Sequence, residues 1–591
     1  MIYKGKIPVV VGVTGHRDID GTDREELKRE VKAALGDVRA ACVGAHGEQS
    51  TPIIMLNAFA QGADMLCAEA AFEMGIDVCA VLPCEEHIYA ESFTDPAERA
   101  KLSSLLNAAK RVITAPDVEQ NRAWLDEQFG MSERDYEYRQ AGIYIAEHAH
   151  IVLALWDGNL PREKFGCGTV EVIKFALEHK YSDGDHLFHP GILNDTAVLW
   201  INARKSGGKK SSVQRRWLVG QFDKEENTSP YGDYYVCDGM PEYIGKIISK
   251  TVAYNDADGS CNEMSLWKSS EELDEYRKAL ACHYSKADEL SFNKNQKYYN
   301  LFILLVAILG TFVAFAFMLY DDASLTFMIL PCALAVCVLL WLIWRGRRMD
   351  YQTKYIEYRA FAEAFRIQFY MSMCLKETLV LSNVCRLYSW TQKVDSAWIY
   401  KALQAVAAIN ASEALDIQTS RIIDVWIGNS DEPKGQLRYH SEKLKKNKRI
   451  SLNYDKLTLI LNIVTIAIYA FIFVIEMVNH ILSVAEISWF WEGEIVEGLS
   501  WRSVGIIVMG TATAASLLFT SYFGKLSFGR KAEDNLKMSM FYTSAYARWE
   551  EAKLRPAADI AKFVREIARE EIVENGIWCS YARDNHLEIN I

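Results

Sequence analysis

The chain has 591 residues, 50% of them hydrophobic and 24% charged, so it is long and apolar enough for two or three packed domains and is not a disordered protein. Its 65 lysines and arginines are outnumbered by 77 aspartates and glutamates, and the net charge of −12 gives no electrostatic reason to expect binding to a nucleic-acid duplex. The 13 cysteines form no Cys-x-x-Cys pair and no zinc-finger spacing, which favours reduced thiols and gives no reason to expect a metal or another cofactor.

The first 205 residues alternate between short apolar runs and helix-like segments. This alternation predicts a mainly parallel sheet in a Rossmann-like α/β domain, with ligands at the carboxyl ends of the strands. Residues 1–6 lead directly into the first run and lack the longer apolar core of a signal peptide, so we expect this domain to stay in the cytoplasm. The predicted strands are Val9–Thr14, Ile53–Leu56, Val78–Leu82, Arg111–Thr114, Ile151–Trp156 and Ala197–Ile201.

Three glycine-containing loops follow these strands and are predicted to form a phosphate-sized site. Glycine lets the backbone approach a ligand, Arg17 offers a planar fork of donors, and the helix that opens at Gln61–Asp64 has free N–H groups at its start. A single glycine after a strand is more often a simple turn, His16 is equally explained by packing or capping, and Asp157 is also explained by capping a turn. The predicted ligand-binding residues are Gly12, Thr14, Gly15, His16, Arg17, Gln61, Gly62, Ala63, Asp64, Asp157, Gly158, Gly166, Gly168, Thr169 and Glu171.

Four uncharged stretches follow, each long enough to cross a hydrocarbon core of about 30 Å. They are Leu301–Tyr320, Leu325–Trp344, Leu457–Ile475 and Ser503–Phe523. The short connections within each pair predict an all-α membrane region with two transmembrane hairpins and cytosolic helices. Basic residues flank the outer ends of both pairs, whereas the two hairpin tips are acidic and contain one basic residue, Arg502. This asymmetry predicts a multi-pass protein with both termini in the cytoplasm, and it disfavours the alternative of buried helices in a soluble protein.

The spans contain no ionisable residue, which argues against a transporter with a proton relay inside the membrane. Four spans with so little polar lining can hardly enclose a water path alone, so a homo-oligomer in contact with the lipid bilayer is expected. The residues of the fourth span that could line a pore are Thr511, Thr513, Ser516 and Thr520.

The cytoplasmic stretches around the two hairpins resemble each other. His283–Lys286 precedes the first hairpin as Tyr439–Glu442 precedes the second, and Arg359–Arg366 follows the first as Arg530–Lys537 follows the second. A tandem duplication explains this pattern, although juxtamembrane helices share a basic, Ala/Glu-rich composition for other reasons. The predicted domains are residues 1–250, a first two-span repeat at 275–430 and a second at 436–591.

The motifs of the first domain resemble the SLOG superfamily, which includes LOG-type phosphoribohydrolases and DprA-like proteins, over residues 7–205. The two hairpins with their cytosolic helices are similar to tandem SLATT domains, two-span effectors found beside SLOG domains in bacterial conflict systems, over residues 280–580. The motifs that carry the SLOG resemblance are Gly12–Arg17, Gln61–Asp64, Val81–Pro83, Ala141–Tyr144, Leu155–Gly158 and Gly168–Thr169.

This resemblance implies a ligand-gated membrane effector. A nucleotide-derived second messenger would occupy the SLOG domain, and the spans would permeabilise the bacterial inner membrane in anti-phage defence. LOG hydrolases place a catalytic glutamate in a Gly-Gly-x-Gly-Thr-x-x-Glu pattern, whereas here Val172 takes that position and Glu171 lies one residue early. One residue turns a helical side chain by about 100°, so binding is favoured over turnover and no catalytic residue is assigned. The alternatives are a membrane-anchored nucleotide hydrolase using Glu171 or Asp157, and a passive membrane-anchored nucleotide-binding scaffold.

Overall fold

The computed structural model forms two compact units, and each is made of segments that are distant in sequence. The α/β unit contains Met1–Ala287, Ala360–Thr419 and Ala557–Ile577, and the helical unit contains the segments between and after them. The three domains predicted from the sequence, residues 1–250, 275–430 and 436–591, stay a prediction. The structure describes all residues except 1, 2, 4, 46, 48, 50, 117–126, 128–129, 160–166, 179–194, 207–212, 221–234, 322–325, 376–396, 410–416, 432, 497–498 and 585–591.

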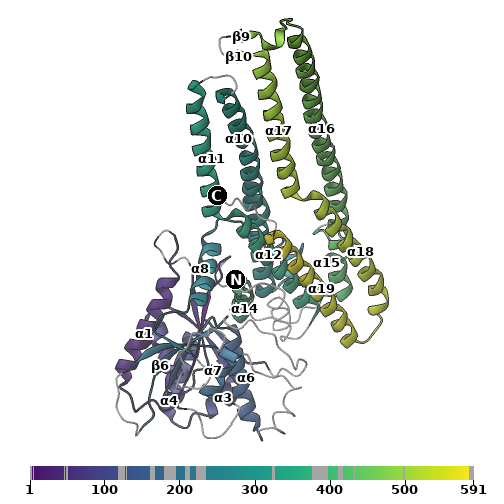
Figure 1. Ribbon diagram of the computed structural model, residues 1–591. Coiled ribbons are helices and arrows are strands. Elements are labelled where there is room, and N and C mark those ends of the chain that lie inside the picture. The colour runs from purple at the N-terminus through teal and green to yellow at the C-terminus, as the bar shows by residue number, and fades with distance from the viewer. Residues whose placement is uncertain are drawn as a thin grey trace. The chain divides into compact units, whose positions relative to one another are not determined.

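An eight-stranded sheet organises the α/β unit, and helices pack around it (Figure 1). The strand order is β4-β3-β2-β1-β5-β6-β7-β8. The first six strands pair in parallel, which confirms the predicted α/β class and all six predicted strands. The antiparallel strands β7 and β8 at one edge were not predicted. The strands are β1 (Val9–Gly15), β2 (Ile53–Asn57), β3 (Asp77–Leu82), β4 (Arg111–Thr114), β5 (Ile151–Trp156), β6 (Ala197–Asn202), β7 (Arg215–Val219) and β8 (Tyr235–Cys237).

Both faces of this sheet are buried under helices. Successive side chains of a strand point to opposite faces, so one strand contributes to two cores. Val9, Val11 and Val13 of β1 pack in one core, together with α1, α2, α4 and α8. Val152 and Trp156 of β5 pack in the other core, together with α6 and α7. These helices are α1 (Arg24–Ala41), α2 (Ala63–Glu73), α4 (Pro96–Ala108), α6 (Glu133–His148), α7 (Thr169–Glu178) and α8 (Glu242–Asp256).

Strand order reverses at β1, which lies between β2 and β5. The chain winds outward from β1 to β4 on one side and then returns to β5 on the other. The connections after β1 and β5 therefore diverge, which leaves a crevice at the carboxyl ends of these two strands.

Helices from the second half of the chain complete the α/β unit. The ammonium group of Lys401, in α14 (Ala397–Ile409), is fully buried, 3.6 Å from the Asp195 carboxylate, and it donates to the Ala149 carbonyl at 2.9 Å. Phe361, in α12 (Tyr351–Cys374), stacks on Tyr254 of α8 with ring centroids 4.7 Å apart. The sequence did not predict that this unit includes these later helices.

The expectation that the cysteines are reduced is wrong for one pair. Cys261 and Cys282 form a disulfide, with Cα atoms 4.4 Å apart. The turn after α8 and the helix α9 (Glu275–Asp288) bring the two residues together. Their separation of 21 residues gave no sign of this proximity.

The helical unit contains four helices long and apolar enough to span a membrane within the described part of the chain, which confirms the membrane prediction at this level. Their apolar side chains face outward, and Leu330, Ile466 and Leu517 are each about two-thirds exposed or more. Exposed apolar surface of this extent marks contact with a membrane or with another protein, and the length of these helices fits a membrane span. The four helices are α10 (Lys297–Asp321), α11 (Ile329–Met349), α16 (Gln436–Val484) and α17 (Trp501–Leu526).

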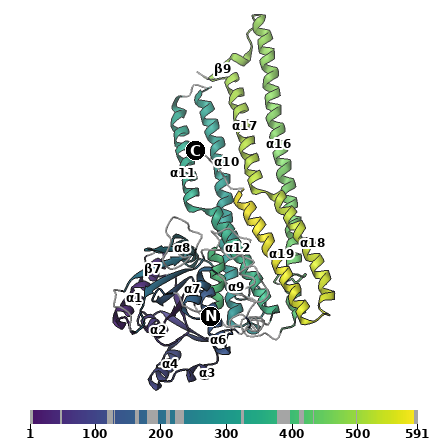
Figure 2. The same cartoon turned by 60° about the horizontal axis from the view of Figure 1, so that its bottom comes forward.

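Small residues let these helices pack closely. Gly310 of α10 lies against Leu518 of α17, and Gly510 of α17 lies against Met318 of α10. Helices in lipid usually associate through small residues such as glycine, because these let the two backbones approach closely. Helix α10 thus packs on both α11 and α17, and α16 packs on α17 and on α18 (Phe528–Ala552), as Figure 2 also shows.

Candidate ligand-binding site

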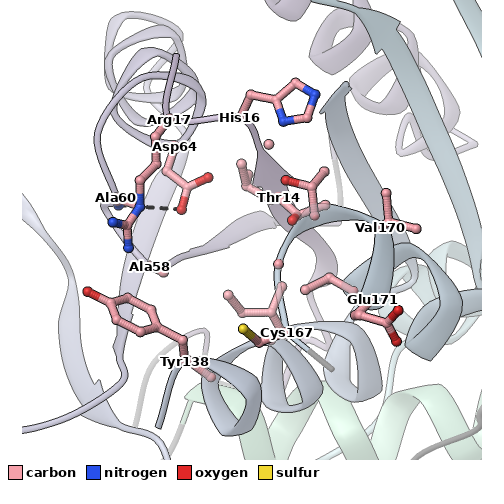
Figure 3. A pocket seen from close by; sticks show the side chains of 18 of the residues that line it. Thr14, His16, Arg17, Ala58, Ala60, Asp64, Tyr138, Cys167, Val170 and Glu171 are labelled. Atoms are coloured by element: carbon pink, nitrogen blue, oxygen red, sulfur yellow. Dashed lines mark hydrogen bonds between the residues drawn. The ribbon is translucent and has the colours of Figure 1, made fainter. Parts of the chain in front are cut away.

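A cavity of about 610 Å³ lies at the carboxyl ends of β1 and β5, where the strand order reverses. Its walls come from the loop after β1, the start of α2, one side of α6 and the start of α7 (Figure 3). Cavities of this size hold drug-sized or nucleotide-sized molecules. The position agrees with the general rule for ligands of open α/β sheets.

Arg17 is an exposed cation of this cavity. Its guanidinium lies 5.0 Å from the centre of the Tyr138 ring, which orients it without using its N–H donors (Figure 3). Arg134 and Lys205 also line the cavity. None of these three has a carboxylate partner within ion-pair distance among the described residues, so their charges are available to an anion.

The carboxylates of the lining are satisfied by protein groups. Asp157 lies 3.0 Å from Nε2 of His16, Glu171 pairs with Lys174 at 2.9 Å, and Asp135 accepts from the Ser132 hydroxyl. Among these acids only Glu171 is neutralised by a cation, so the preference for an anionic ligand rests on the three basic side chains that lack an ion-pair partner among the described residues.

His16 and Asp157 form a buried polar contact at the base of the cavity. Burial lowers the pKa of His16, although the Asp157 carboxylate opposes this effect, so the imidazole is neutral at pH 7. Burial alone would raise the pKa of Asp157, but hydrogen bonds from Asn159 and His16 lower it. Because Nε2–H of the neutral imidazole donates to Asp157, Nδ1 is unprotonated and can only accept a hydrogen bond from a ligand.

Asp64 opens α2 and is buried beneath Arg17. Burial raises the pKa of its carboxyl to about 7, even though the Ala60 N–H donates to it at 3.4 Å and the charge of Arg17 opposes the shift. The backbone here is strained as well, because Phe59 has a φ of 53° while its side chain is fully buried. A perturbed carboxyl beside a strained turn is typical of functional sites.

The start of α7 forms the far wall. Gly168 has a φ of 105°, which only glycine adopts readily, and Thr169 begins the helix. In Figure 3 the Glu171 carboxylate lies on the opposite side of the cavity from Arg17 and Asp64. Val172 packs toward Gly142 of α6, where a side chain on the glycine would lie 2.7 Å from a Val172 methyl group.

Nine of the predicted ligand-binding residues line this cavity: Thr14, Gly15, His16, Arg17, Asp64, Asp157, Gly168, Thr169 and Glu171. Their role in binding stays a prediction. Gly166 lies outside the described residues. The predicted residues that do not line the cavity are Gly12, Gln61, Gly62, Ala63 and Gly158.

These five residues have structural roles around the cavity. Gly12 lets α6 pack on β1, because a side chain there would lie 2.7 Å from an Ile145 methyl group. Gly62 and Gly158 have φ values of 78° and 81°, and both form turns. Gln61 bonds to the Glu98 carboxylate and Ala63 packs against Gly15.

The sequence-based prediction missed the wall formed by α6. Arg134 and Tyr138 lie one helical turn apart on the face that lines the cavity, and Lys205 enters from the end of β6. The Ala141–Tyr144 motif, which carried part of the resemblance, lies in the same helix and was the available signal.

Comparison with protein-family models and with curated proteins finds no match to this chain. The inferences about function therefore rest on the geometry of the cavity, on the apolar helices and on the motif resemblance.

Proposed function

We propose that the protein is a membrane effector gated by a nucleotide-derived ligand, which binds in the cavity of the α/β unit. The observation that carries this proposal is the unpaired cation set of Arg17, Arg134 and Lys205 around a nucleotide-sized cavity at the switch point of the sheet. A guanidinium held by an aromatic ring, with its donors free, suits bidentate contact with a phosphate.

Binding without turnover is the better interpretation of this site. The Glu171 carboxylate is already paired with Lys174, and Val172 occupies the position where the LOG hydrolases carry their catalytic glutamate. The hydrolase alternative would need Glu171 or Asp157 to act as general acid or base. Both carboxylates have protein partners here.

The four apolar helices would be the effector, and the two predicted repeats that contain them support the proposed duplication. Each predicted repeat begins with one very long helix, Glu275–Asp321 with 47 residues and Gln436–Val484 with 49. The second span of each ends at a residue with left-handed backbone, Asp350 in the first (φ 48°) and Ser527 in the second (φ 51°). Cytosolic helices of 24 and 25 residues follow.

These likenesses support tandem SLATT-like hairpins after a SLOG-like domain, in the bacterial inner membrane with both termini in the cytoplasm. Defence against phage, through permeabilisation of the membrane by a homo-oligomer, is the role that this arrangement suggests.

Helix α12 offers a covalent route for coupling, because residues up to Arg359 belong to the helical unit and residues from Ala360 belong to the α/β unit. A ligand can shift the spans only if it binds two states of the protein with different affinities.

The test is release of an encapsulated dye from liposomes that contain the full chain, with and without cyclic nucleotides and nucleotide extracts. Arg17→Ala should abolish ligand-dependent release, since one charge-assisted phosphate contact is worth about 1.5–3 kcal/mol, or roughly 10- to 150-fold in affinity. Arg29→Ala, which removes an exposed arginine of α1, is the matched control and should leave release unchanged.

Each alternative predicts a different result. Ligand binding without release under any condition would favour the passive scaffold. Nucleotide breakdown that is lost in Glu171→Gln, with release unaffected, would favour the hydrolase.

A further inference from the structure

A second, smaller cavity lies inside the helical unit, at the end of α17. Its volume of about 60 Å³ suits one small group and is far below that of a nucleotide site. It is lined by the end of α17 and the start of α18, together with residues of α10, α12 and α19 (Ala557–Asp584).

The lining is strongly basic. Three basic residues, Lys525, Arg530 and Lys531, line it together with one carboxyl group, that of Asp534. The guanidinium of Arg530 lies 3.3 Å from the Asp534 carboxylate and 5.0 Å from the centre of the Tyr581 ring, so this pair is already neutralised within the protein.

Lys531 lacks such a partner. Within the described part of the chain no carboxylate lies at ion-pair distance from its ammonium group, and its closest charge-related contact is the face of the Phe528 ring at 5.0 Å. Burial lowers its pKa to about 8. Lys531 is partly buried, and a partly buried ammonium group without a counter-ion favours the binding of an anion.

The backbone adds donors to the same place. Ser527 has left-handed backbone between α17 and α18, and its side chain does not cap α18. The first N–H groups of a helix have no acceptor within it, so this end of α18 favours negative charge.

The location indicates the source of this anion. Lys525 and Ser527 lie two and four residues beyond the uncharged stretch that ends at Phe523, at the depth where lipid headgroups are expected. Trp578 and Tyr581 complete the lining, and both residue types prefer the boundary between hydrocarbon and water.

We propose that this cavity binds the phosphate group of an anionic phospholipid at the cytoplasmic end of α17. The lipid would contact α17, α18 and α19 together and hold the turn at Ser527 in place. This proposal depends on α17 spanning the membrane and is independent of the ligand in the larger cavity.

The experiment uses the purified full chain in detergent, with thermal stability measured against short-chain phosphatidylglycerol, short-chain phosphatidylcholine and inorganic phosphate. Binding to the folded state alone raises the midpoint of unfolding in proportion to ln(1 + [L]/Kd). Phosphatidylglycerol should stabilise the protein at concentrations where phosphatidylcholine does not.

Lys531→Gln should weaken this response by roughly tenfold or more, as expected for the loss of a charge-assisted contact. Lys525→Gln is a second variant of the same site and should act in the same direction. Lys448→Gln removes an exposed basic residue that precedes the third span, so it controls for general attraction to anionic lipid and should respond like the parent.

Three results would overturn the proposal. Equal stabilisation by phosphatidylcholine would show that the charge is not recognised. Equal stabilisation by inorganic phosphate would assign the site to a free anion, and an unchanged response in both Lys531→Gln and Lys525→Gln would place lipid binding elsewhere.

Discussion

Asp64 provides the sharpest test of the cavity's electrostatics. Its carboxyl is buried at the start of α2, and burial raises its pKa from 3.8 to about 7. The folded state therefore holds this proton more tightly than the unfolded state does. Between pH 3.8 and about 7 the contribution of Asp64 to stability falls as the pH rises, and above that range the loss is complete.

The size of the effect follows from the shift. A difference of about three pKa units corresponds to about 4 kcal/mol at 1.36 kcal/mol per unit. Asp64→Asn keeps the shape of the side chain and its acceptor for the Ala60 N–H, but it cannot ionise. We expect this variant to be more stable than the parent by about 4 kcal/mol near pH 8 and by less than about 2 kcal/mol near pH 5.

The assay is urea denaturation of both full-length proteins in detergent across this pH range, followed by tryptophan fluorescence. The comparison must be a difference, because burial lowers the pKa of His16, His148, His150 and His283, and this makes the folded state more stable as the pH rises. That contribution is common to both proteins and cancels. A stability difference that does not change with pH would refute the burial argument for Asp64.

Two further predictions concern the α/β unit. Lys401→Met removes the cation beside the buried Asp195 carboxylate and should lower the free energy of unfolding by about 3–5 kcal/mol in the same denaturation assay. The double variant Lys401→Met/Asp195→Asn should recover part of this stability. If the single and double variants were equally unstable, the ion pair would not be the cause. Gly62→Ala places a side chain against the Arg17 carbonyl at a φ of 78° and should cost about 1–3 kcal/mol, whereas Gly36→Ala, in open space within α1, should gain about 0.5–1 kcal/mol. If both substitutions changed the free energy of unfolding in the same direction, the argument from backbone conformation would be contradicted.

Much of the fold could be predicted from local patterns. The runs at Val9–Thr14 and Ile151–Trp156 are apolar without interruption because both faces of those strands are covered, and all six predicted strands occur. The four apolar helices were equally clear, because an uncharged stretch of that length is long enough to cross a hydrocarbon core. Of the predicted glycines, Gly15 and Gly168 line the cavity beside β1, and the binding role of this site stays a prediction.

Contacts between distant segments required the tertiary structure, because they depend on which elements meet rather than on any local pattern. Tyr138 and Arg134 belong to the cavity only because α6 packs beside β1. Lys401 is buried against Asp195 across more than 200 residues, and Cys261 reaches Cys282 through a turn. Length, composition and periodicity thus determined whether each segment is a strand, a soluble helix or an apolar helix. The tertiary structure alone decided which charged side chains line each cavity, because those side chains come from segments that are distant in sequence.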